Sequence, residues 1–199
     1  MSRTFAGLAA ALVVSAAFPA AAATTIVLDF DDLTGLGAMP STYQGVAFED
    51  FSYYDTPKLP QYPTKSGMTS LYANYDRHQP GSASTSIFRF GDDVRFDGAW
   101  FAGRLAVVFE LYRDGQRVHT SSPLGLNSTM QYLASGYDGL VDEVRLYGNS
   151  GNWVMDDLTY SVGDFAAPAP EPATWAMMIL GFGAAGAVIR RRRGVAFAI

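Results

Sequence analysis

The sequence predicts an all-β protein, an antiparallel β-sandwich with a helical segment before it and another after it. Short runs of β-branched and aromatic residues recur from Thr25 to Tyr160, and residues typical of turns separate them. Inside that range, no stretch longer than a turn places apolar residues at helical spacing. An apolar segment lies near each end of the chain. We therefore expect a strand-rich ectodomain between a signal-peptide helix and a single membrane-anchoring helix.

Residues 1–23 predict a secretory signal peptide. Arg3 precedes an apolar run from Phe5 to Phe18, and a proline and four alanines follow. These small residues suit cleavage by a signal peptidase after Ala22 or Ala23. A retained anchor is the alternative, although the apolar run is short for a hydrocarbon core of about 30 Å.

The ectodomain, residues 24–165, predicts nine strands. Asp114-Gly115 is typical of a tight hairpin turn, and the alternation at Val144 and Leu146 indicates a strand with one buried face. Nine short strands with turns between them favour a sandwich. The predicted strands are Thr25–Phe30, Val46–Tyr54, Ser86–Phe90, Val94–Ala102, Leu105–Tyr112, Arg117–Ser121, Thr129–Leu133, Leu140–Tyr147 and Asn152–Tyr160.

Residues 55–86 follow no period and contain four prolines, which predicts a long loop. Long ordered loops on a sandwich are where binding sites are often built. Tyrosines in and before this loop suit stacking on sugar rings, and the alternative is that they only cover the end of the sandwich. The candidate sugar-binding residues are Tyr53, Tyr54, Tyr62, Tyr72 and Tyr75.

Charge and cysteine content exclude several classes of function. Residues 24–165 contain nine Lys and Arg against eighteen Asp and Glu, a net charge of −9, compared with −5 for the whole chain. Nucleic acid is not an expected partner, because binding to phosphates draws its affinity from a basic surface. The chain has no cysteine, so it forms no disulfide, thiolate metal site or cysteine nucleophile.

The sequence predicts no catalytic residues and no enzymatic activity. His78 and His119 lie in no nucleophile or zinc-binding motif. The ectodomain has three glutamates, Glu49, Glu110 and Glu143. Glycosidases cleave the glycosidic bond with a pair of carboxyl groups, and these glutamates could supply such a pair. A secreted hydrolase therefore stays as a distant alternative.

Two pairs of aspartates, Asp31-Asp32 and Asp156-Asp157, lie on or beside the first and last predicted strands. We expect these two strands to be neighbours, which brings the pairs together. Adjacent strand residues point to opposite faces, so one aspartate of each pair is expected to face a shared site. Close carboxylates need a cation or hydrogen bonds, and calcium accepts such oxygen ligands. A structural calcium ion is one interpretation, and aspartates that bind backbone amides in turns are the other.

The last part of the chain predicts a membrane address. Residues 166–172 form a proline-rich linker, and residues 173–199 begin with an uncharged stretch from Trp175 to Ile189 that ends at Arg190–Arg193. Fifteen residues rise about 22 Å as a helix, which is short for a hydrocarbon core of about 30 Å. The arginines predict that the C-terminus stays in the cytoplasm and that the ectodomain is outside.

The tail contains three features in a fixed order: Pro170-Glu171-Pro172, then Trp175-Ala176, then the run Arg190, Arg191, Arg192 and Arg193. This tail closely resembles the PEP-CTERM protein-sorting domain. The resemblance implies processing by an exosortase, a membrane enzyme thought to cut near Pro-Glu-Pro in Gram-negative bacteria that make extracellular polysaccharide. It also implies transient anchoring in the membrane, followed by delivery to the cell surface or extracellular matrix.

The ectodomain itself resembles galactose-binding or carbohydrate-binding jelly rolls, on the segments Tyr43–Phe48, Val141–Arg145 and Asp156–Tyr160. Three functions follow as expectations. The first is a non-enzymatic cell-envelope or matrix protein, the second a module that binds extracellular polysaccharide, and the third the hydrolase. Coplanar exposed aromatic rings beside polar side chains would favour the second.

Overall fold

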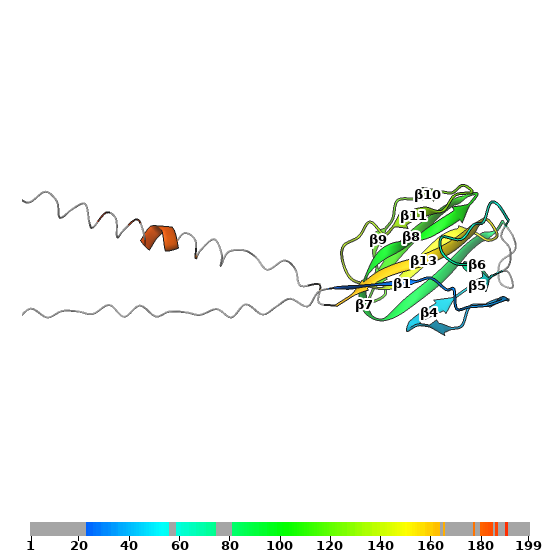
Figure 1. The fold of residues 1–199 in the computed structure, drawn as a ribbon, viewed down its shortest axis with the longest axis horizontal. Coiled ribbons are helices and arrows are strands. Elements are labelled where there is room, and N and C mark those ends of the chain that lie inside the picture. Colours follow the sequence, from blue (N-terminus) through cyan, green and yellow to red (C-terminus); the bar gives the residue numbers. More distant parts are fainter. Residues whose placement is uncertain are drawn as a thin grey trace, which may run out of the picture. The chain divides into compact units, whose positions relative to one another are not determined.

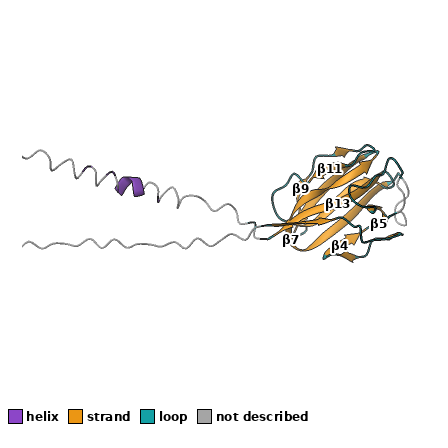
Figure 2. Cartoon of the chain, viewed as in Figure 1, coloured by secondary structure: helices purple, strands orange, loops and turns teal. Residues whose placement is uncertain are grey.

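The computed structural model describes residues 23–55, 59–74, 81–163 and 165, together with Met177, residues 180–184, Gly186 and Arg190. The chain divides into two compact units, Met1–Asp164 and Phe165–Ile199. In the described part of the first unit, all regular structure is β-strand, which confirms the all-β prediction (Figure 2). Every strand pair is antiparallel.

Thirteen strands run through the described residues of the first unit (Figure 1). They are β1 (Thr24–Leu28), β2 (Leu36–Ala38), β3 (Thr42–Tyr43), β4 (Val46–Glu49), β5 (Phe51–Tyr54), β6 (Ser70–Ala73), β7 (Ala83–Gly103), β8 (Ala106–Arg113), β9 (Gln116–Thr120), β10 (Leu124–Gly125), β11 (Gln131–Ala134), β12 (Val141–Asn149) and β13 (Trp153–Val162).

Strand β7 belongs to both layers of the sandwich. Its first part, up to Val94, pairs with β4 and β12, and β12 in turn pairs with β8. Its second part, from Arg95 onward, pairs with β13 and β11. The sequence predicted two strands here, but β7 is one strand that continues through residues 91–93. The 21 residues of β7 are long enough to cross from one layer to the other.

The first and last strands lie side by side, as the sequence predicted. Thr24 to Leu28 of β1 pair with Val162 to Leu158 of β13. The opposite edge of β13 pairs with β7. Residues that follow β1 and residues near the middle of β13 are therefore brought together, although 125 or more positions separate them in the chain.

Two other sequence predictions were wrong in detail. The single strand predicted over residues 46–54 is divided at Asp50, whose φ of 63° turns the chain so that β4 and β5 enter different layers. The predicted loop after residue 55 contains β6, which pairs with β5 and β13. The hairpin prediction is confirmed, because Asp114 and Gly115 have φ of 51° and 73° between β8 and β9.

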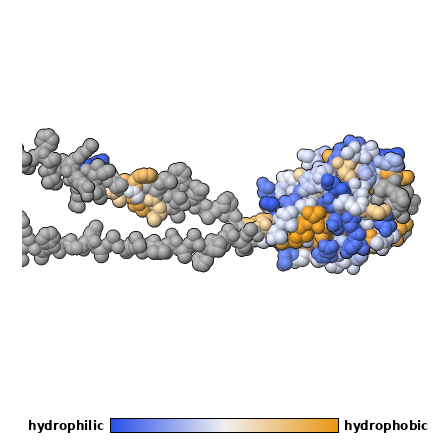
Figure 3. All heavy atoms as spheres, in the orientation of Figure 1, coloured by the Kyte–Doolittle hydropathy of each residue, from blue (hydrophilic) through white to orange (hydrophobic). Residues whose placement is uncertain are grey.

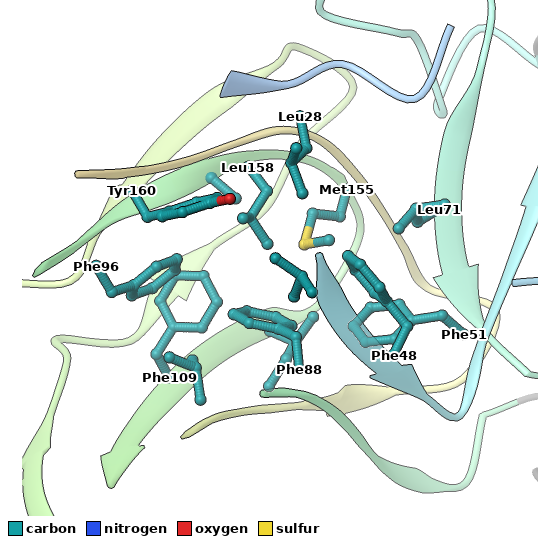
Figure 4. Close-up of a cluster of buried hydrophobic side chains, with 14 of the residues drawn as sticks. Leu28, Phe48, Phe51, Leu71, Phe88, Phe96, Phe109, Met155, Leu158 and Tyr160 are labelled. Carbon is teal, nitrogen blue, oxygen red and sulfur yellow. The ribbon is translucent and has the colours of Figure 1, made fainter. Parts of the chain in front are cut away.

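The core between the layers is aromatic (Figure 4). Phe88 contacts Phe48, Phe96 and Phe109, with ring centroids 6.2, 5.5 and 6.3 Å away. Met155 of β13 is fully buried in the same cluster. All described strands and all core residues lie between Thr24 and Val162, so this segment holds its own core.

The second unit is described only at a few positions, and Met177, residues 180–184, Gly186 and Arg190 are helical. None of the helices built from described residues is long and apolar enough to span a membrane. The predicted signal peptide up to Ala22 lies outside the described residues. So do Tyr75, Pro170, Glu171, Pro172, Trp175, Ala176, Arg191, Arg192 and Arg193.

Candidate functional site

Three of the four predicted aspartates, Asp31, Asp156 and Asp157, meet at one segment, residues 64–69, which we call the clamped loop. Asp31 Oδ1 accepts hydrogen bonds from the backbone N–H groups of Met68, at 3.0 Å, and Thr69, at 3.3 Å. Gly67 lies directly against this carboxylate, since a Cβ built on it would be 2.0 Å from the carboxylate atoms of Asp31. With a φ of 35° as well, the position favours glycine, and Asp31 holds one end of the loop.

Asp156 holds the other end of the clamped loop. Its Oδ2 accepts hydrogen bonds from the backbone N–H groups of Lys65, at 2.7 Å, and Ser66, at 3.1 Å. Its Oδ1 accepts from the N–H of Asp157 at 2.8 Å. Burial raises the pKa of Asp156 to about 7, although these three N–H groups oppose the rise. Asp156 is thus a fully buried carboxyl group whose polar partners are nearly all backbone.

The expected alternation fails at Asp156 and Asp157. Both side chains contact Ser66, because Asp157 Oδ1 accepts a hydrogen bond from Ser66 Oγ at 2.7 Å. Asp157 has a φ of 46°, and the register of β13 against β7 shifts between Asp156 and Thr159. This bulge turns two successive side chains toward the same loop.

Asp32 lies apart from the clamped loop and accepts a hydrogen bond from the Tyr43 hydroxyl. Burial, followed by this hydrogen bond, raises the pKa of Tyr43. Among the described residues, no group of three or more His, Asp or Glu side chains is arranged to hold a metal ion. Hydrogen bonds therefore account for all four aspartates, and the calcium interpretation stays an untested prediction.

The predicted sugar-binding tyrosines do not form a flat exposed surface in the described part of the chain. Tyr72 is buried, and its ring meets that of Tyr54 edge-on at 5.4 Å. The Tyr62 hydroxyl donates to the Gly151 carbonyl at 2.7 Å. Tyr53 is half-buried and packs against the core. These contacts match the alternative in which the tyrosines cover one end of the sandwich.

A different aromatic pair, Trp100 on β7 and Tyr132 on β11, lies on the outer side of the sandwich. The two residues are register partners, and their ring centroids are 5.5 Å apart with a tilt of 58°. Lys65 of the clamped loop places its Nζ 4.2 Å from the centroid of the Trp100 ring. Tyr132 is 38% exposed, which is high for a tyrosine in the middle of a strand.

Sequence reasoning missed this pair because it searched the loops for aromatic residues. The available signal was the alternation in β7, where Ala99 and Phe101 face the core and Trp100 must therefore face outward. Gly98 leaves space for β11: a Cβ built on Gly98 would be 2.2 Å from the Leu133 carbonyl oxygen and 2.9 Å from the Tyr132 hydroxyl. The ring therefore lies against the sheet.

Polar groups border the pair on β7 and β13. Arg95 and Asp97 form an ion pair at 3.1 Å, and Ser161 Oγ donates to Asp97 Oδ2 at 2.8 Å. Partial burial, and then the charge of Asp97, raises the pKa of Tyr132, while a hydrogen bond with Thr159 opposes the rise. Tyr132 is therefore near both Asp97 and Thr159.

The three glutamates of the ectodomain lie on the other layer, each beside an arginine. Arg89 bridges Glu49 at 2.9 Å and Glu143 at 2.6 Å. Arg145 also reaches Glu143 at 2.6 Å, and Arg117 reaches Glu110 at 2.5 Å. Partial burial raises the pKa of Glu110 and Glu143, but hydrogen bonds outweigh it and lower both pKa values. A general acid of a glycosidase needs a raised pKa, whereas the hydrogen bonds of Glu110 and Glu143 shift their pKa values in the opposite direction.

The histidine in the described residues, His119, stacks on Tyr137 with ring centroids 5.4 Å apart and a tilt of 14°. His78 lies outside the described residues.

Comparison with known families identifies the tail. Residues 168–193 match the PEP-CTERM protein-sorting motif, which confirms the resemblance of Pro170-Glu171-Pro172 and the arginine run. No curated protein matches the chain.

Among solved structures, three mutants of CBM29-2, a family 29 carbohydrate-binding module, are similar to this chain. Their sequence identities are 14%, 14% and 13%, and each has a TM-score of 0.43. The alignments cover 74%, 73% and 74% of this chain and 99% of each module. A TM-score this low carries no argument about function.

Proposed function

We propose that this chain is an exported, non-enzymatic protein of the cell envelope or extracellular matrix, sorted by its C-terminal tail. A signal peptidase removes residues 1–23, and the apolar segment from Trp175 to Ile189 then holds the chain transiently in the membrane. An exosortase processes the tail near Pro-Glu-Pro. The observation that carries this proposal is the PEP-CTERM match over residues 168–193, whose last four residues are Arg190–Arg193.

The test changes the motif in the native host. Glu171→Ala is expected to block processing, so that the protein stays in the membrane with its C-terminal peptide attached. Thr174→Ala, at a position between the motif residues Pro172 and Trp175, is the matched control and is expected to be processed normally. Cell fractionation and mass spectrometry of the C-terminal peptide measure both results. Normal release of the Glu171→Ala protein would refute the proposal.

The contacts of the glutamates support a non-enzymatic role. Glu49, Glu110 and Glu143 neutralise arginines on the outer side of the sandwich. The secreted-hydrolase alternative needs two carboxyl groups of different pKa beside a bound substrate, and lowered pKa values at Glu110 and Glu143 do not supply the protonated one.

A carbohydrate-binding module is the second candidate function. The specific observation that favours it is Tyr132, an exposed ring that lies against β7 beside Trp100, Lys65 and Asp97. Purified residues 24–165 carry the whole described core, so this segment is suitable for a glycan-binding screen. Binding of an extracellular polysaccharide would support this candidate and leave the sorting proposal unaffected.

A further inference from the structure

The outer side of β1, β13, β7 and β11 carries a continuous set of side chains that we call the aromatic face: Val27, Thr159, Tyr132 and Trp100. Val27 is the register partner of Thr159, and Thr159 is the register partner of Gly98, over which Tyr132 lies. Trp100 is the partner of Tyr132. Val27 of β1 is 50% exposed. Figure 3 shows a hydrophobic patch over the position of β1, bordered by hydrophilic atoms.

The two rings of the aromatic face have different roles because they are not coplanar. Their tilt of 58° prevents a single flat ligand from stacking on both. Lys65 Nζ already lies 4.2 Å from the Trp100 centroid, so Trp100 is partly covered. Tyr132 rests with its hydroxyl end over Gly98 and leaves its outer side exposed to solvent. Tyr132 is therefore the ring on which a ligand can stack, which we call the stacking surface, and Trp100 lies beside it.

Hydrogen-bonding groups surround this stacking surface. Lys65 borders it at Trp100, and the Arg95–Asp97 ion pair borders it on β7. Ser161 is fully buried and donates to Asp97 Oδ2, so it holds Asp97 in place, and the exposed Thr25 lies beside it with Oγ1 3.2 Å from Ser161 Oγ. An apolar ring bordered by charged and hydroxyl groups matches a pyranose, which has an apolar C–H side and equatorial hydroxyls.

We infer that the aromatic face binds a neutral polysaccharide, with one sugar ring stacked on Tyr132 and its hydroxyls bonded to Lys65 and Asp97. This inference rests on the carbohydrate-binding candidate and is independent of the sorting proposal. The net charge of −9 on residues 24–165 disfavours an acidic polysaccharide, because like charges repel. A second protein copy fits less well, since charged groups are depleted from the cores of protein interfaces.

The experiment is native affinity electrophoresis of residues 24–165 in gels containing a soluble polysaccharide. Glucomannan, xyloglucan, mixed-linkage β-glucan, galactan and dextran are the neutral probes, and alginate is the acidic probe. At least one neutral probe is expected to retard the wild-type protein, and alginate is not. Tyr132→Ala is expected to weaken that retardation about tenfold or more, as truncation of a central aromatic contact does.

Tyr112→Ala is the matched control, because Tyr112 is a partly exposed tyrosine on β8 of the other layer, where its ring lies against Arg145. It is expected to keep wild-type binding. Tyr132→Leu is a second variant, which keeps an apolar side chain over Gly98 but removes the flat ring. It replaces Tyr132→Ala in the binding assay if the Tyr132→Ala protein shows no cooperative unfolding and is therefore not folded. Gel filtration checks that each protein has the wild-type elution volume.

The outcomes separate the site from the function. No retardation by any of the probes would overturn the inference together with the carbohydrate-binding candidate, and retardation by alginate alone would overturn the inference but not the candidate. Retardation that survives both Tyr132→Ala and Tyr132→Leu, or that Tyr112→Ala abolishes, would overturn only the placement at Tyr132. A concentration-dependent dimer that Tyr132→Ala dissociates would assign the aromatic face to a second copy and would also overturn the inference.

Discussion

Raising the pH from about 4 to about 7 is expected to destabilise the sandwich through Asp156. The side chain is fully buried, and burial raises its pKa from 3.8 to about 7. In the unfolded chain the same carboxyl group is in water and loses its proton near its ordinary pKa. Within this pH range the group is therefore neutral in the folded protein and charged in the unfolded one.

The sign and size of the effect follow from proton linkage. Where the folded state binds more protons than the unfolded state, the free energy of unfolding falls as the pH rises. A difference of about three pKa units, at about 1.4 kcal/mol per unit, gives a loss of up to about 4 kcal/mol. The contribution is fully present below about pH 4 and is gone above about pH 7.

Urea unfolding of residues 24–165 measures this effect at several pH values, beside the variant Asp156→Asn. Asparagine does not titrate, so the difference in unfolding free energy between the two proteins isolates Asp156. Glu110 and Glu143, whose pKa values are lowered, titrate in both proteins and cancel from the difference.

The wild-type protein is expected to lose stability relative to Asp156→Asn as the pH rises. A gain relative to the variant would refute the reasoning, because it would mean that the N–H groups of Lys65, Ser66 and Asp157 outweigh burial. A difference that is constant with pH would show that the pKa of Asp156 is the same in the folded and unfolded states.

Three further expectations concern the clamped loop and the tail. Gly67→Ala is expected to lower the free energy of unfolding, measured in urea, by about 1 to 3 kcal/mol, because the new Cβ displaces Asp31. Gly91→Ala is the control, and it should change this free energy little because the space around Gly91 is open. The thermal unfolding midpoint of residues 24–165 is expected to be the same in calcium and in chelator, since backbone amides already bind the carboxylates of Asp31 and Asp156. A gain in the free energy of unfolding of about 2.7 kcal/mol, in calcium at a hundredfold excess over Kd, would establish a bound ion instead. Replacing Arg190–Arg193 by neutral residues should weaken membrane retention and orientation in cell fractionation, and unchanged topology would count against the positive-inside argument.

Local chemistry was enough to predict much of the fold. The Asp114-Gly115 turn depends on two residues that accept positive φ, so the β8–β9 hairpin was readable directly. The alternation at Val144 and Leu146 identified the buried side of β12. The tail motif is also local, because motif, apolar stretch and arginines follow one another in the chain.

The strand boundaries around Asp50 and residues 91–93 were not predictable from propensity. A positive φ at Asp50 ends β4 and begins β5 in another layer, and only the packing of both layers favours that turn. The continuity of β7 likewise depends on partners in both layers, β12 and β13, which lie far away in the sequence.

The sequence alone determined a β-rich chain with a sorting motif in its tail, because composition, periodicity and contiguous motifs carry that information. Only the tertiary structure decided what the aspartates and aromatic residues contact. A bulge at Asp157 turned two carboxylates toward Ser66, and a glycine at position 98 made room for the ring of Tyr132 from another strand. Such contacts arise from register and irregularities between distant strands, and a pattern along one strand does not encode them.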